Sequence, residues 1–217
     1  MAEEKSKKVE EKETGRLESF SDGLFAFAIT LLVLNLRDPV EGASGALFSG
    51  LISEWPAFFA FFTSFFTILI MWVNHHHMMD SIRRIDTRFM FLNGVLLLTV
   101  VLNPFTTMLV ADHLLDSNAS TAVGVYAGTF VFLSLVWNVV WRYASKGHRL
   151  ISSVVSDEII AKTNRDFNYG TLLYGVAFLL SFITAIGSIL TILGLAVFWA
   201  ASAPSRSLVE RKTQGIP

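Results

Sequence analysis

Long apolar stretches dominate this chain and restrict the folds open to it. A bilayer core takes about 20 apolar residues as a helix, with a range of roughly 17–25. Stretches near this length cover residues 20–36, 58–73 (or from Leu47), 89–110 and 119–141. A fifth block, 169–203, is long enough for two short spans with a break near residues 185–188. The sequence predicts an all-α integral membrane protein with six spans, or with five if the last block is a re-entrant hairpin.

Composition excludes a soluble globular domain. Hydrophobic residues make up 53% of the chain and charged residues 16%, against roughly 25% charged in ordinary soluble domains. So much apolar surface could not be hidden by a soluble domain of 217 residues. The net charge of −1 gives no basic balance toward nucleic acid, so no nucleic-acid partner is expected.

The lysines and arginines predict the orientation, because cytoplasmic loops hold the excess of these residues. Sixteen of the 17 lie in the N-terminal tail, in the loops after the second and fourth segments, or in the C-terminal tail; only Arg37 lies in an opposite loop. Six spans with both termini in the cytoplasm fit this split, whereas five spans would place the C-terminal cluster outside. The expected location is a plasma membrane.

The segments outside the spans have their own predictions. Residues 1–15 are charged and low in complexity, so we expect a disordered cytoplasmic tail, followed by a membrane domain over 16–203 and a cytoplasmic tail over 204–217. Ser156 precedes Asp157 and Glu158, a pattern typical of a helix start, so the loop 142–166 is expected to hold a short cytoplasmic helix.

Polar residues inside the spans are mostly Thr, Ser and Asn, which serve as hydrogen-bonding contacts between membrane helices; Asn93 is one of them. The exception is Asp22, about one turn into the first span. A carboxylate there is either buried with a partner from another segment or solvated at headgroup level, and the residues alone leave both readings open. The inner end of the second segment offers Trp72 and His75–His77 as partners.

The first span also has a narrow face at helical spacing, formed by Phe20, Gly23, Leu24, Phe27, Thr30, Leu31 and Leu34. On sequence alone an ordinary packing face is favoured. A pore made of apolar rings is physically possible, because hydrophobic constrictions gate by dewetting.

The stretch Arg16-x-x-x-Phe20-Ser21-Asp22 running into a span, residues 72–76 (WVNHH) and 103–105 (NPF) together resemble the transmembrane-protein-175 family. These are the endolysosomal potassium channels and their prokaryotic relatives. The resemblance covers the six-segment layout of nearly the whole chain.

The resemblance implies a homotetramer whose pore is lined by the first helix of each subunit, with no re-entrant selectivity-filter loop. Apolar rings on that helix form the narrow point, which corresponds here to Phe27, with Thr30 and Leu34 next along the pore. Phe27 departs from the family, which has a bulky aliphatic residue at this position.

The resemblance also implies a structural network that holds the motif in place. In this network Arg16, Phe20, Ser21 and Asp22 are joined by hydrogen bonds to Trp72 and to His75 or His76. That supplies the partner that Asp22 requires and favours its buried, structural reading.

We therefore expect a potassium-preferring cation channel in the lipid bilayer, passing K⁺ and other monovalent cations without catalysis, cofactor or bound metal. A di-iron enzyme would need more than the five histidines present. A secondary transporter is the alternative function, although such proteins usually place ionisable groups or broken helices at the midplane.

Overall fold

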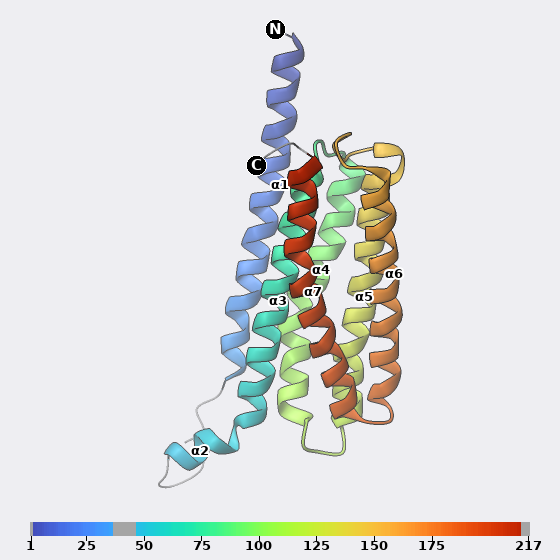
Figure 1. The fold of residues 1–217 in the computed structure, drawn as a ribbon. Coiled ribbons are helices and arrows are strands. Elements are labelled where there is room, and N and C mark those ends of the chain that lie inside the picture. The colour runs from blue at the N-terminus through green and yellow to red at the C-terminus, as the bar shows by residue number, and fades with distance from the viewer. Residues whose placement is uncertain (1, 37–46, 214–217) are drawn as a thin grey trace.

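The structure is a computed structural model that describes residues 2–36 and 47–213. Its elements are α1 (Ala2–Leu31), η1 (Leu32–Asn35), α2 (Leu47–Ser53), α3 (Trp55–Ser81), α4 (Thr87–His113), α5 (Ala119–Ser145), η2 (Lys146–His148), α6 (Asp157–Ser181) and α7 (Ala185–Thr213). Six long helices lie side by side, and α2 projects from the end opposite the N-terminus (Figure 1). The predicted all-α fold class is confirmed for the described residues, whose β-pairing is limited to one bridge.

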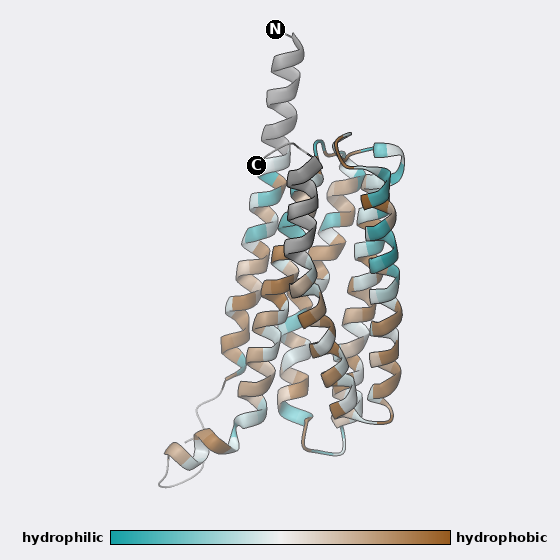
Figure 2. Ribbon diagram, in the orientation of Figure 1, coloured by the Kyte–Doolittle hydropathy of each residue, from teal (hydrophilic) through white to brown (hydrophobic). Residues whose placement is uncertain are grey.

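Five helices are long and apolar enough to cross a membrane: Thr14–Asn35, Trp55–Ser81, Thr87–His113, Ala119–His148 and Ala185–Ser202. The remaining predicted span lies in α6, which packs along α5 and α7 but does not meet that standard. The reason is its first ten residues, which carry five charges and appear hydrophilic in Figure 2. The short cytoplasmic helix predicted after Ser156 is therefore the start of α6 and not a separate element. The Ser156 hydroxyl does cap it, accepting the Ile159 N–H at 3.4 Å.

The break in the last apolar block lies earlier than predicted. It covers residues 182–184, not 185–188, because α6 ends at Ser181 and α7 begins at Ala185. The Thr184 hydroxyl accepts the Gly187 N–H at 3.2 Å, as a capping side chain does, so residues 185–188 form the first turn of α7.

The second predicted segment is divided into two helices. Leu47 starts the short helix α2, and α3 begins at Trp55 with Pro56 in its first turn, where a proline without an N–H costs no hydrogen bond. Exposed apolar side chains cover much of α2.

Both terminal segments continue the neighbouring helices in the structure. Residues 2–15 form the start of α1, and their sequence places Glu3 and Glu4 four residues before Lys7 and Lys8, a spacing that favours helix. At the other end α7 continues through Pro204 to Thr213, and residues 214–217 lie outside the described chain.

The helix α1 lies at the edge of the bundle, against α3 and α4 (Figure 1). In its most apolar 18 residues only 22% are buried by the rest of the chain, against 50% in α4 and α5. The core is centred on α4 and α5, where Phe89, Leu96, Val100 and Phe130 are almost completely covered.

Candidate functional site

The membrane part of α1 has two different faces. Ser21, Phe25, Ala28 and Leu32 are buried against the bundle, with spacings of four, three and four residues. The other face, which we call the α1 stripe, is formed by Phe20, Gly23, Phe27, Thr30 and Leu34, and all five residues are exposed in the described chain. The expected pore residues thus share one uncovered face. Leu24 and Leu31, which the sequence placed on the same face, are half-buried at its border.

The α1 stripe is apolar apart from one hydroxyl. Phe27 is 53% exposed and Leu34 73% exposed. Thr30 lies between them and donates its hydroxyl proton to the Phe27 carbonyl at 2.8 Å. Because that proton is engaged within the helix, the lone pairs of Thr30 Oγ1 remain as acceptors on the uncovered side.

A buried chain of hydrogen bonds ties α1 to α4 and α3. The Ser21 hydroxyl donates to the Leu17 carbonyl at 2.8 Å, so its oxygen must accept from Asn93 Nδ2 at 3.0 Å. The amide oxygen of Asn93 then faces His75 Nε2 at 2.9 Å, which must carry the donated proton. Ser21, Asn93 and His75 are all 0% exposed, so water does not compete for these bonds.

Asp22 has its partner in the stretch of residues 72–76, at the end of the second predicted segment. Trp72 Nε1 donates to Asp22 Oδ1 at 2.8 Å. The Asp22 side chain is half-buried, between the two situations that the sequence left open. The Trp72 ring also stacks on His76, with centroids 5.9 Å apart and an angle of 25° between the planes.

His76 contacts acidic groups on two helices. Its Nδ1 lies 3.1 Å from Glu18 Oε1 on α1, and its Nε2 lies 4.0 Å from Asp80 Oδ2 on α3. In the described chain these three residues form one group whose ligand atoms lie within 4.8 Å of one another, close enough to hold a metal ion. All three are partly or fully exposed, and they supply one donor fewer than the four of a structural zinc site.

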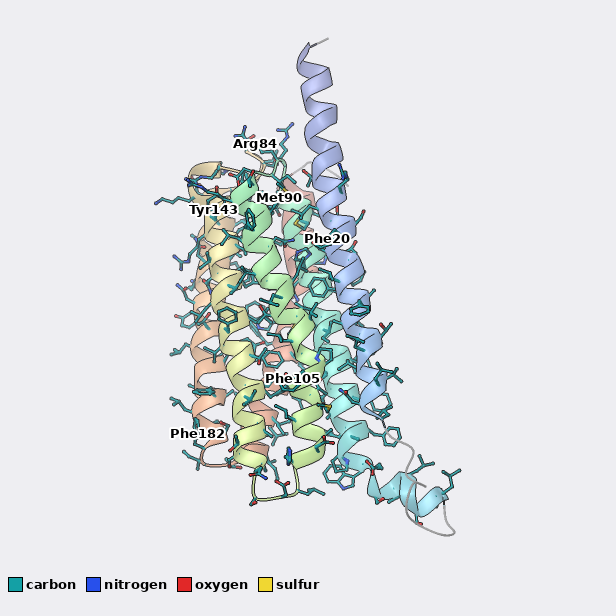
Figure 3. All side chains as sticks on the ribbon, turned by 180° about the vertical axis from the view of Figure 1, so that it is seen from behind. Phe20, Arg84, Met90, Phe105, Tyr143 and Phe182 are labelled. Atoms are coloured by element: carbon teal, nitrogen blue, oxygen red, sulfur yellow. The ribbon has the colours of Figure 1, made fainter. Side chains whose placement is uncertain are left out.

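Arg16 and Phe20 lie outside the hydrogen-bond chain. Both are exposed, and Phe20, 60% uncovered, belongs to the α1 stripe with Phe27. Phe20 is labelled on α1 in Figure 3. Within the network that the resemblance assigned, the structure links Ser21 to His75 through Asn93. It joins Asp22 to Trp72 directly and places His76 beside Trp72.

A further contact fixes the far end of α1. Asn35 Nδ2 donates to the carbonyl of Pro104 in α4 at 3.0 Å. Pro104 lies inside α4 and lacks the N–H of an ordinary helical residue, within the 103–105 motif found in the sequence.

Sequence reasoning missed the importance of Asn93. It was one of several polar residues assigned to generic helix contacts, yet it joins residues from two other helices in the structure. The available signal was its position: Asn93, like Asp22, lies about one turn into its predicted segment, and the third segment starts shortly after the histidines that follow the second.

Comparison with known proteins identifies the family. The family model "Endosomal/lysosomal potassium channel TMEM175" matches residues 16–104, which include the second half of α1, all of α3 and most of α4. A potassium channel of the cyanobacterium Chamaesiphon minutus is 42% identical over 88% of this chain and 95% of its own length. A potassium channel of Streptomyces collinus is 36% identical over 80% of this chain and 84% of its own length.

The fold agrees with a solved structure. The crystal structure of a lysosomal potassium-selective channel TMEM175 homologue from Chamaesiphon minutus superposes with a TM-score of 0.79 and 40% identity, over 88% of this chain and 98% of that one. The family and these relatives are ion channels, not enzymes. On sequence and fold together, the chain is a member of the TMEM175 family.

Proposed function

We propose that this chain is the subunit of a potassium-preferring cation channel. Four copies assemble around an axis in a plasma membrane, with six spans each and both termini in the cytoplasm. The α1 helices line the pore, and Phe27, Thr30 and Leu34 face it.

The observation that carries this proposal is the uncovered α1 stripe. An outer face in contact with lipid is served by large apolar side chains, as on α4, where Phe91, Leu98 and Phe105 are exposed. That face of α4 also exposes a glycine, Gly94, but between Phe91 and Phe105 it exposes no hydroxyl. The α1 stripe differs from it in the exposed hydroxyl of Thr30, which lies between the large residues. Small and hydroxyl-bearing residues suit close approach between helices and contact with ions.

Phe27 forms the constriction in this proposal. It is the largest side chain in the middle of the α1 stripe, so four copies set the minimum radius. An ion that passes an apolar ring keeps its water or loses it without replacement ligands. Water loss costs less for K⁺ than for the smaller Na⁺, so such a ring favours K⁺, and it closes by dewetting when it narrows. The Thr30 oxygens, one turn further along, provide partial replacement ligands.

The test compares two phenylalanines of equal exposure. Phe27 is 53% exposed on α1, and Phe105 is 52% exposed on α4. In planar bilayers with K⁺ on one side and Na⁺ on the other, Phe27→Ala should raise the unitary current and move the reversal potential toward zero. Phe105→Ala should leave both at wild-type values. Thr30→Ala should weaken selectivity with less effect on conductance, whereas Thr30→Ser keeps the hydroxyl and should retain selectivity.

Two outcomes would contradict the proposal. Wild-type values for Phe27→Ala would mean that Phe27 does not line the narrow point. Electroneutral exchange without unitary currents in the wild-type protein would indicate a transporter.

A further inference from the structure

Four arginines gather at the end of the bundle that carries the N-terminus. Arg83, Arg84 and Arg88 belong to the α3–α4 connection and the first turn of α4, and Arg149 follows η2. We call these four residues the arginine patch, and all of them are exposed. Figure 3 shows Arg84 at this end of the molecule, near Tyr143 of α5.

Backbone pairing brings the two loops together. Ile82 forms an antiparallel bridge with Ile151, and both side chains are 5% exposed. The Arg83 N–H donates to the Leu150 carbonyl at 2.9 Å, and the Ser152 N–H donates to the Ser81 carbonyl at 3.1 Å. The backbone segments that carry Arg83, Arg84 and Arg149 are therefore held side by side.

Two of the guanidinium groups are also positioned by their own contacts. Arg84 Nε donates to the Arg149 carbonyl at 3.2 Å. The guanidinium of Arg149 lies 4.7 Å from the centre of the Tyr143 ring. A stacked guanidinium keeps its N–H donors at the edge of the plane, where they can bind an anion.

The positive charge of the arginine patch is not balanced by ion pairs. Among the described residues, the ion pairs within 4.0 Å all involve histidine, and none involves these arginines. The nearest carboxylate in the sequence, Asp86, accepts the Phe89 N–H at 2.8 Å and the Tyr143 hydroxyl at 2.7 Å. It also interacts electrostatically with Arg149, so it offsets part of one of the four positive charges. Asp80 contacts His76 and His77, and Asp157 contacts His148.

An apolar strip continues from the arginine patch along the outside of α4. It follows Arg88 at spacings of three and four residues and consists of Phe91, Val95, Leu98 and Leu102, which are 74%, 39%, 56% and 44% exposed. Cations at the end of an exposed apolar strip match a phospholipid, whose headgroup is charged and whose tails are apolar. Binding of a free anion or an acidic peptide would not require contact with the apolar strip.

We propose that the arginine patch binds the phosphate of an anionic phospholipid whose acyl chain lies along the apolar strip of α4. Guanidinium groups bind phosphate oxygens through paired N–H donors, and basic clusters beside membrane helices attract anionic lipids. This site is separate from the α1 stripe and does not depend on the pore assignment.

The test uses the purified full-length protein in neutral detergent, titrated with phosphatidylglycerol and followed by native mass spectrometry. Arg83→Gln/Arg88→Gln removes two charges whose side chains make no contact that holds the loops. Each cation near a membrane surface contributes about 1 kcal/mol, so the apparent Kd should rise about thirty-fold. Lys162→Gln/Arg165→Gln is the matched control: it removes two exposed cations from α6 and should leave the Kd unchanged. If the double variant fails to fold, Arg83→Gln and Arg88→Gln singly should each raise the Kd about fivefold.

Three results would overturn the proposal. Equal weakening in both double variants would mean general surface charge and not a site. Equal binding of phosphatidylcholine would remove the requirement for an anionic headgroup. Displacement of the lipid by an equal concentration of inorganic phosphate would mean a free-anion site without a role for the apolar strip.

Discussion

Asn93→Ala tests whether the buried hydrogen-bond chain holds α1 in place. The asparagine accepts from His75 on α3 and donates to Ser21 on α1, and all three side chains are 0% exposed. Alanine at this position removes both bonds. Ser21 still donates to the Leu17 carbonyl, so the principal loss falls on the His75 Nε2–H, which is left buried without an acceptor.

The magnitude follows from that orphaned donor. A buried group without its partner costs about 1–3 kcal/mol, and we take about 2 kcal/mol. For a chain of 150–250 residues the melting temperature falls by about 2–4 °C per kcal/mol, so we expect a loss of about 4–8 °C. The space vacated by the amide adds to this loss.

The assay is thermal unfolding in detergent, followed by the monodisperse fraction on size exclusion. Thr129→Ala is the control, because the Thr129 hydroxyl donates only to the Val125 carbonyl one turn earlier in the same helix. Ser21→Ala and the double variant complete a cycle, in which residues of one network should show a coupling of about 0.5–3 kcal/mol.

Two results would refute the reasoning. If Asn93→Ala melts within 1 °C of Thr129→Ala, the hydrogen-bond chain does not stabilise the packing of α1. Simple addition of the Ser21→Ala and Asn93→Ala effects would show that the two side chains act independently.

Three further predictions follow from other contacts. Asp22→Ala should lower the yield of tetramer on size exclusion and leave the ion selectivity of the remaining channels close to wild type. A normal tetramer yield with altered selectivity would make Asp22 a permeation residue. Gly170→Ala should destabilise the α6–α7 contact by about 1–3 kcal/mol, because the new Cβ would lie 2.5 Å from Trp199 Cζ2, and Trp199→Phe should restore part of the loss in thermal unfolding. Partial burial raises the pKa of Asp86, but hydrogen bonds from Tyr143 and the Phe89 N–H, with the charge of Arg149, hold it below its ordinary value. Because its pKa is lowered, ionised Asp86 stabilises the folded state at pH values above its ordinary pKa near 4, and this stabilisation is lost as the pH falls. The difference in unfolding free energy between wild type and Tyr143→Phe should therefore shrink in acid. A difference that stays constant with pH would contradict the assignment.

Much of the fold could be predicted because the bilayer imposes a length and a hydropathy on each spanning helix. The starts and ends of α4 and α5 lie within four residues of the predicted stretches 89–110 and 119–141. The predictions differed from the structure where polar, charged sequence forms a helix. Residues 2–15 and the start of α6 are polar and charged, yet they are helical, because Glu, Lys and Ala favour helix regardless of burial.

The candidate site was predictable in part. Helical periodicity alone grouped Phe27, Thr30 and Leu34, and they share an uncovered face in the structure. The partners of Asp22 and Ser21 lie 50 and 72 residues away along the chain, and no local pattern encodes such distances. Family motifs pointed to Trp72, but they did not include Asn93, whose role depends on how α4 packs between the other two helices.

The contacts of α1 with α4 have a mechanical consequence. Ser21 bonds to Asn93 near one end of the span, and Asn35 bonds to the Pro104 carbonyl near the other. These two anchors are 14 residues apart, about 20 Å along a helix. A helix held at two such points can neither rotate about its axis nor slide along it without breaking one of these hydrogen bonds. In the proposed tetramer, a movement that widens or narrows the ring of α1 stripes must therefore move α4 together with α1.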